Sequence, residues 1–161
     1  MCLLFRRIDR LICQTPVLNV EGGRIEGVVD EEGVTVYKGI PYAAPPVGEL
    51  RWKHPQPVQP WQGVRKCDRF GAASLQSKAT KGTFYWKEFY QNGSPEMSED
   101  CLYLNVWTPA AGKKESKLPV MVWIHGGAFQ NGFGHEIEFD GDAYAQKGVV
   151  LVTLNYRLGM C

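Results

Sequence analysis

The segment at residues 120–134, VMVWIHGGAFQNGFG, holds the residue types whose spacing could do chemistry. An apolar run leads directly into His125, Gly126, Gly127 and Ala128. Glycine permits a sharp backbone turn and brings amide hydrogens to ~3 Å from a ligand oxygen without a Cβ in the way. Such a loop is typical of an oxyanion hole, in which backbone N–H groups bind the negative oxygen that develops on an attacked carbonyl. The segment therefore predicts a part in acyl-transfer chemistry.

The sequence lacks the motif of the nucleophile that such a loop would serve. The sequence Gly-x-Ser-x-Gly, a turn that presents a nucleophilic serine, occurs nowhere among the 161 residues. We therefore expect the nucleophile, its general base and the acid that orients the base to be encoded beyond Cys161. We also expect the 161 residues alone to be inactive.

Length and composition are those of one domain with a core. The chain has 44% hydrophobic and 12% aromatic residues, and its net charge of +1 gives no field that would favour nucleic acid or an anionic membrane. No apolar run approaches the ~18 to 20 residues of a membrane span. The five cysteines form no CxxC pair and lie at no ligand spacing from a histidine, which argues against a zinc site.

The first sixteen residues, which begin MCLLFRRIDRLICQ, carry no uninterrupted apolar run of signal-peptide length. Secretion is therefore not supported. Leu4, Ile8, Leu11 and Ile12 recur at helical intervals and would suit a short amphipathic helix. A disordered leader or a misassigned start is the alternative.

Short β-type runs open the remainder of the chain and are separated by hairpin signals. They lie at residues 17–20, 24–29 and 34–40. We expect them to form a small β-meander. The proline-dense stretch 41–60 excludes a helix interior and a central strand. Its large aromatic residues gain stability mainly when packed, so we expect an ordered loop pressed on a core.

Residues 74–99 are polar and weakly periodic, which indicates a surface excursion with one helical turn. Three stronger strand-like runs are found at residues 102–108, 119–124 and 149–154. The last two are almost continuously apolar, which marks strands covered on both faces. Between them, Asp140 can cap a short helix that Gly148 ends. A strand that finished at Asn155 would lie exposed unless more chain covered it. The predicted fold class is α/β, with a mixed central sheet.

Four motifs carry a family resemblance. They are YKGIPYAAPPVGELRWKHPQP at 37–57, SEDCLYLNVWTP at 98–109, VMVWIHGGAFQNGFG at 120–134 and LVTLNYRLG at 151–159. Together they resemble the type-B carboxylesterase and cholinesterase family, and HGGAF in place of HGGGF is nearest to its bacterial para-nitrobenzyl-esterase-like members. The resemblance implies that residues 17–161 are an incomplete N-terminal portion of an α/β-hydrolase domain. Residues 1–16 stay unmatched.

The resemblance also implies a chemistry. The N–H groups of Gly127 and Ala128 would bind the oxyanion, while Gly126 and His125 would support the loop. A third donor would follow the absent serine, and losing one donor typically costs ~3 to 4 kcal/mol of transition-state stabilisation. His54 and His135 have no acid partner at an interpretable spacing and are interpreted as surface or loop residues. The substrate would be a small-molecule carboxylic ester, with no metal or organic cofactor.

The family resemblance also implies two structural expectations. Arg51 should form an ion pair with Glu99, and breaking that pair would cost ~3 to 5 kcal/mol if it were buried. In secreted members the cysteine corresponding to Cys101 forms a disulfide, but Ser74 stands where its partner should be, and Cys67 is seven residues too early. We therefore expect a buried thiol at Cys101. This favours a reducing, cytoplasmic setting without establishing one.

Two alternatives stay open at this stage. The aromatic group at 84–90 could line a substrate gorge, or it could be a satellite cluster that holds a long loop down. The whole domain could be an esterase, or it could be a related adhesion protein that binds partners without catalysis. An intact HGGA loop favours the enzyme. The substrate and the oligomeric state are not specified by these motifs.

Overall fold

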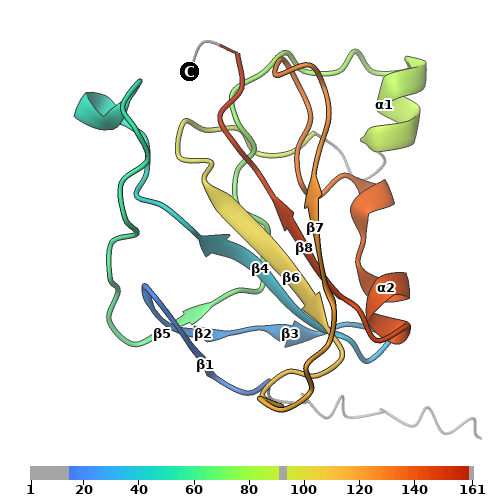
Figure 1. The fold of residues 1–161 in the computed structure, drawn as a ribbon. Coiled ribbons are helices and arrows are strands. Elements are labelled where there is room, and N and C mark those ends of the chain that lie inside the picture. The colour runs from blue at the N-terminus through green and yellow to red at the C-terminus, as the bar shows by residue number, and fades with distance from the viewer. Residues whose placement is uncertain (1–14, 91–93, 160–161) are drawn as a thin grey trace, which may run out of the picture.

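A computed structural model describes residues 15–90 and 94–159, which form two β-sheets with short helices (Figure 1). The smaller sheet has three strands in the order β1-β2-β5, and the larger has five in the order β3-β4-β6-β8-β7. The strands are β1 (Leu18–Val20), β2 (Gly23–Glu26), β3 (Val28–Val29), β4 (Thr35–Pro41), β5 (Val64–Lys66), β6 (Tyr103–Thr108), β7 (Val120–Ile124) and β8 (Val150–Leu154). None of the helices in these residues is long and apolar enough to cross a membrane.

The predicted meander is divided between the two sheets. Strands β1 and β2 form an antiparallel hairpin, and β2 then pairs in parallel with β5. The run at 24–29 breaks into β2 and β3 at Gly27, where a Cβ would lie 2.5 Å from the carbonyl oxygen of Val36. Strand β3 turns back onto β4 within the larger sheet. The hairpins are therefore present, but they do not form one continuous meander.

The larger sheet is mixed, as predicted. Strands β3 and β4, β4 and β6, and β6 and β8 pair antiparallel, whereas β8 pairs in parallel with β7. The chain passes from β7 through helix α2 (Asp142–Gln146) to β8, which lies between β6 and β7. Consequently β8 is an inner strand, and the expectation that its end would form the exposed edge is wrong.

Strand β7 is the edge strand instead. All five of its residues are exposed, from 39% at Trp123 to 66% at Ile124, so the expectation that this run is covered on both faces is wrong for the described residues. In β8, by contrast, Leu151 and Thr153 are buried. An apolar run predicts a strand, but it does not specify the neighbours that cover it.

Helix α2 packs through Ala145 against a core that includes Trp107 and Leu151. Its N-cap is Gly141 rather than the predicted Asp140. A Cβ at Gly141 would lie 2.4 Å from the Trp107 ring, so the position requires glycine, while the Asp140 carboxylate accepts a hydrogen bond from the Asp142 N–H group at 3.0 Å. The helix ends at Gln146 with Lys147 as its C-cap, and the predicted terminator Gly148 follows the cap with a φ of 78°.

The proline-dense loop is pressed on the core only in its first part. The Tyr42 hydroxyl donates a hydrogen bond to the Asn155 carbonyl at 2.7 Å, and Ala43 and Ala44 are buried. Trp52, however, is 65% exposed. The expected helical turn in the excursion is α1 (Phe84–Phe89), which Thr83 caps by accepting a hydrogen bond from the Trp86 N–H group.

Candidate oxyanion loop

The candidate loop begins where the sheet ends. The pairing of β7 with β8 stops at Ile124 and Leu154, and the chain then leaves the sheet. The carbonyl group of Gly127 accepts hydrogen bonds from the N–H groups of Gln130 at 2.9 Å and Asn131 at 3.3 Å, which closes a tight turn. Gly127 has a φ of 111°, and a Cβ there would lie 1.9 Å from the Asn131 carbonyl oxygen. Only glycine fits this position.

Two further residues of the turn have left-handed backbones. Ala128 has a φ of 52° and Phe129 a φ of 59°. Such a conformation costs a non-glycine residue of order 1 kcal/mol or more, and it persists only where the surroundings impose it. Backbone strain of this kind is concentrated at functional sites.

The N–H groups of Gly127 and Ala128 belong to an exposed part of this turn. Both residues are exposed, and neither N–H group donates a hydrogen bond to any residue that the structure describes. The amide dipoles are therefore not consumed by strand pairing. They can donate to an external oxygen.

His125 lies beneath the turn. Its Nδ1 is 2.8 Å from the Gly126 carbonyl oxygen, and its ring stacks on Tyr156 with 4.3 Å between centroids and 13° between planes. The Tyr156 hydroxyl donates a hydrogen bond to the His125 carbonyl oxygen. Burial lowers the pKa of His125. These contacts suit the loop-supporting role inferred for this residue.

The side chains of Gln76 and Asn155 hold the far end of the loop, and Ser74 holds the segment beside it. The Gln76 side chain accepts from the Gly132 N–H group at 2.8 Å and donates to the Gly132 carbonyl at 2.9 Å. Asn155 accepts from the Gly134 N–H group at 2.7 Å, and the Ser74 hydroxyl accepts from the Leu158 N–H group at 3.0 Å. Of these, only Asn155 lies in a quoted motif, and a contact for Gln76 was not predicted from the sequence.

His135, expected to be a surface or loop residue, lies in a turn but is only partly exposed. Its ring lies between Phe70, with centroids 4.6 Å apart, and Phe133, with centroids 4.7 Å apart. Burial lowers the pKa of His135 to about 4, with a smaller contribution from His125. It is therefore a neutral packing residue at neutral pH. His54 is exposed, as expected.

Glu136 is a buried carboxyl group that sequence reasoning missed. Burial raises the pKa of Glu136 to about 7, and its carboxyl group interacts with the Tyr85 hydroxyl. Nothing in the sequence distinguishes Glu136 from the exposed Glu138 two residues later.

The Arg51 guanidinium lies 2.7 Å from the Glu99 carboxylate. Their side chains are 46% and 26% exposed, so the cost stated for a buried pair does not apply. Cys101 is a fully buried thiol packed with Ala43 and Leu102. Ser74 is buried, and its hydroxyl accepts a hydrogen bond from the Leu158 N–H group.

The aromatic group of the excursion packs as a satellite cluster. Tyr90 is buried against Ala73 and Phe133, with Tyr85, Trp86 and Phe89 beside it. Phe133 belongs to the end of the loop, and its ring centroid lies 5.3 Å from that of Tyr90. The cluster therefore contacts the loop.

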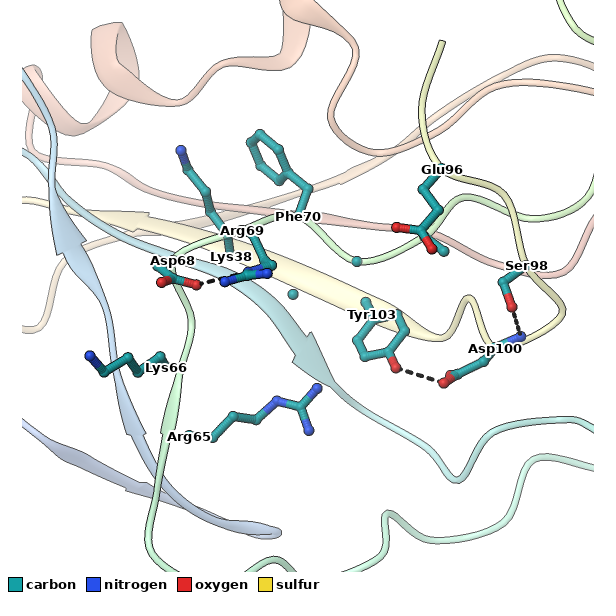
Figure 2. A pocket seen from close by; sticks show the side chains of 13 residues that line it. Lys38, Arg65, Lys66, Asp68, Arg69, Phe70, Glu96, Ser98, Asp100 and Tyr103 are labelled. Atoms are coloured by element: carbon teal, nitrogen blue, oxygen red, sulfur yellow. Dashed lines mark hydrogen bonds and ion pairs between the residues drawn. The ribbon is translucent and has the colours of Figure 1, made fainter.

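The cavity shown in Figure 2 lies elsewhere in the molecule. It has a volume of about 490 Å³, and no residue of 125–134 lines it. Arg65 points toward Tyr103, whose hydroxyl donates a hydrogen bond to Asp100, while the Lys38 ammonium lies over the Phe70 ring (Figure 2). The cavity is therefore separate from the candidate loop. Among residues 15–90 and 94–159, no group of three or more His, Cys, Asp or Glu side chains could hold a metal ion.

Comparison with known proteins places these features in a family. The model of the carboxylesterase family matches residues 14–161. The fumonisin B1 esterase of Sphingopyxis macrogoltabida is 44% identical over 146 residues, covering 89% of this chain and 25% of that protein. The para-nitrobenzyl esterase of Bacillus subtilis (strain 168) is 44% identical over 144 residues, covering 89% of this chain and 28% of that protein.

Solved structures agree with the sequence relatives. A PNB esterase superposes with a TM-score of 0.78 at 41% identity, covering 90% of this chain and 28% of that one. The carboxylesterase EST55 of Geobacillus stearothermophilus gives a TM-score of 0.72 at 43% identity, covering 89% of this chain and 27% of that one. The chain thus spans about a quarter of the length of these relatives. The predicted fold class, the N-terminal part of an α/β-hydrolase, is confirmed, and the chain belongs to the carboxylesterase family.

Proposed function

We propose that this chain supplies the oxyanion loop of a serine carboxylic-ester hydrolase, with the N–H groups of Gly127 and Ala128 as donors. The observation that carries the proposal is the pair of exposed N–H groups on a closed turn, neither of them bonded within the described residues. A partner-binding module has no use for amide donors fixed in this way. Their geometry suits a negative oxygen.

The chemistry of this site is stabilisation of developing charge. When a nucleophile attacks an ester carbonyl, the oxygen gains negative charge, and fixed N–H dipoles bind it without reorganising. Each such donor contributes ~3 to 4 kcal/mol to transition-state stabilisation. By family resemblance, a serine outside these 161 residues would attack, a histidine would transfer the proton, and a carboxylate would orient that histidine.

The substrate class is that of small carboxylic esters. The relatives carry the names fumonisin B1 esterase and para-nitrobenzyl esterase, which share the ester bond as the group acted on.

Two experiments test this proposal. The 161-residue chain alone should hydrolyse para-nitrophenyl acetate no faster than an equal concentration of unrelated protein. A chimera should be active, in which residues 14–161 replace the matching part of the Bacillus subtilis para-nitrobenzyl esterase. In that chimera, Gly127→Ala should lower kcat by ~10²- to 10³-fold, because the new Cβ displaces the turn that carries the donors.

A matched control separates loop effects from general effects of left-handed glycines. Gly33 has a φ of 80° and no atom within 4 Å of a built Cβ, and it lies in the hairpin between β3 and β4. Gly33→Ala should leave kcat unchanged. A chimera that folds but hydrolyses no ester would overturn the proposal and favour the binding-protein alternative.

A further inference from the structure

The Gln76 side chain makes two hydrogen bonds to a single residue of the loop. Its Oε1 accepts from the Gly132 N–H group at 2.8 Å, and its Nε2 donates to the Gly132 carbonyl at 2.9 Å. The same Nε2 donates to the Ser74 carbonyl at 3.2 Å. The side-chain amide thus bonds both the N–H group and the carbonyl of Gly132, as the backbone of a neighbouring strand would. The two residues are 56 positions apart in the sequence.

Gly132 closes the turn that carries the two candidate donors. It follows Asn131, whose N–H group donates to the Gly127 carbonyl. A Cβ on Gly132 would lie 2.5 Å from Nδ1 of His125 and 2.7 Å from the Gly126 carbonyl oxygen. Gly132 therefore sits directly against the first residues of the loop. A displacement of Gly132 would therefore be felt at Gly126, the residue that precedes Gly127.

The segment that presents Gln76 is itself fixed. Ala72 accepts a hydrogen bond from the Asn155 side chain at 2.9 Å, and the same side chain accepts from the Gly134 N–H group at 2.7 Å. Ser74 is bonded to Leu158 at 3.0 Å. The anchors thus come from the end of β8, so Gln76 acts from a base held by the central sheet.

We propose that Gln76 is a positioning residue for the oxyanion loop, holding Gly132 so that the N–H groups of Gly127 and Ala128 keep one direction. Gln76 has no contact with those two N–H groups, so it acts through the backbone. The effect of Gln76 on catalysis rests on the proposed function. The rigidity of the two N–H groups can nevertheless be measured without catalysis.

The experiment measures backbone order in the 161-residue chain by ¹⁵N relaxation. In the wild-type chain, the order parameters of the Gly127 and Ala128 N–H groups should be about 0.85, as in rigid backbone. Gln76→Met keeps the length of the side chain but removes both hydrogen bonds, and the two order parameters should fall below about 0.6. Exchange of the Gly132 amide hydrogen should become at least ~10-fold faster, since it loses its acceptor.

Gln76→Glu provides a second, switchable variant. At neutral pH the carboxylate can accept from the Gly132 N–H group but repels the Gly132 carbonyl oxygen. On protonation the acid regains a donor and matches the glutamine in shape and bonding. Order at Gly127 and Ala128 should therefore return as the pH falls through the range of an ordinary glutamic acid, near ~4.3. A residue that only contributes bulk would show no such recovery.

The exposed Gln59 is the matched control. Gln59→Met and Gln59→Glu should leave the order parameters of the loop unchanged at every pH. The proposal is overturned if Gln76→Met leaves Gly127 and Ala128 as ordered as in the wild-type chain. If Gln76→Met does not fold, a Gln76→Glu variant whose loop order is independent of pH overturns it equally. An inactive chimera with ordered donors would instead refute the proposed function alone.

Discussion

The ring of His125 lies flat against the ring of Tyr156, and the Tyr156 hydroxyl donates a hydrogen bond to the backbone carbonyl of the same histidine. Tyr156 follows β8, whereas His125 follows β7. One side chain therefore fixes both the ring and the backbone at the residue where the loop leaves the sheet.

Removing that hydroxyl should loosen the loop while keeping the stacked rings. Tyr156→Phe leaves the His125 carbonyl without this donor, and the expected loss is ~1 to 2 kcal/mol in the free energy of unfolding. Urea denaturation followed by tryptophan fluorescence measures it. Tyr144→Phe, at a tyrosine that is 41% exposed, is the control and should change the midpoint little. Equal midpoints for Tyr156→Phe and the wild-type chain would contradict the assigned contact.

The buried carboxyl of Glu136 should make stability depend on pH. Its pKa is raised from the ordinary 4.5 to about 7, mainly by burial. Between these values the unfolded chain releases the proton that the folded chain retains, so this contribution to stability is lost as the pH rises from about 4.5 to about 7. Glu136→Gln should remove the loss and stabilise the chain above neutrality by ~2 kcal/mol.

Thermal unfolding between pH 4.5 and pH 8 measures this dependence. Glu138→Gln is the control, because Glu138 is an exposed neighbour of the same charge type. It should retain the dependence on pH that the wild-type chain shows. A Glu136→Gln variant with an unchanged profile would show that the carboxyl ionises freely in the folded chain.

The ion pair between Arg51 and Glu99 should contribute little to stability. Since both side chains are partly exposed, their coupling energy should be ~0 to 1 kcal/mol and should decrease with added salt. A double-mutant cycle with Arg51→Ala and Glu99→Gln isolates this term from the other interactions of Arg51. A coupling of several kcal/mol that salt does not alter would mean that the pair is shielded from water.

Cys67 and Cys101 should be unreactive in the folded chain, because both are buried. Burial also raises the pKa of Cys67 to about 11, which suppresses the reactive thiolate. With the other three cysteines replaced by serine, a thiol reagent should modify almost nothing in the native chain and two thiols after denaturation. Rapid native labelling would contradict the packing around Cys101, and a single thiol after denaturation would reveal oxidation.

Local sequence predicted the elements well. The runs at 102–108, 119–124 and 149–154 lie within one residue of the bounds of β6, β7 and β8. Short apolar stretches bounded by turn residues favour buried strands. The HGGA tetrapeptide likewise predicted a turn with open amides, since the requirement for glycine is local.

Sequence could not predict what depends on distant parts of the chain. The insertion of β8 beside β6 is decided by the crossover through α2, so the exposure of β7 was missed. The pairing of Gln76 with Gly132 joins residues 56 positions apart, and no periodicity encodes it. The buried carboxyl group of Glu136 interacts with the hydroxyl of Tyr85 in the distant excursion, a contact that no local pattern signals.

The exposed edge at β7 has a consequence for handling the molecule. Val120, Val122 and Ile124 present their apolar side chains at 56% to 66% exposure, on a strand with one side unpaired among the described residues. Such an edge is a template for intermolecular β-pairing. During overproduction, this chain should be recovered in inclusion bodies unless a charged residue interrupts the five-residue run.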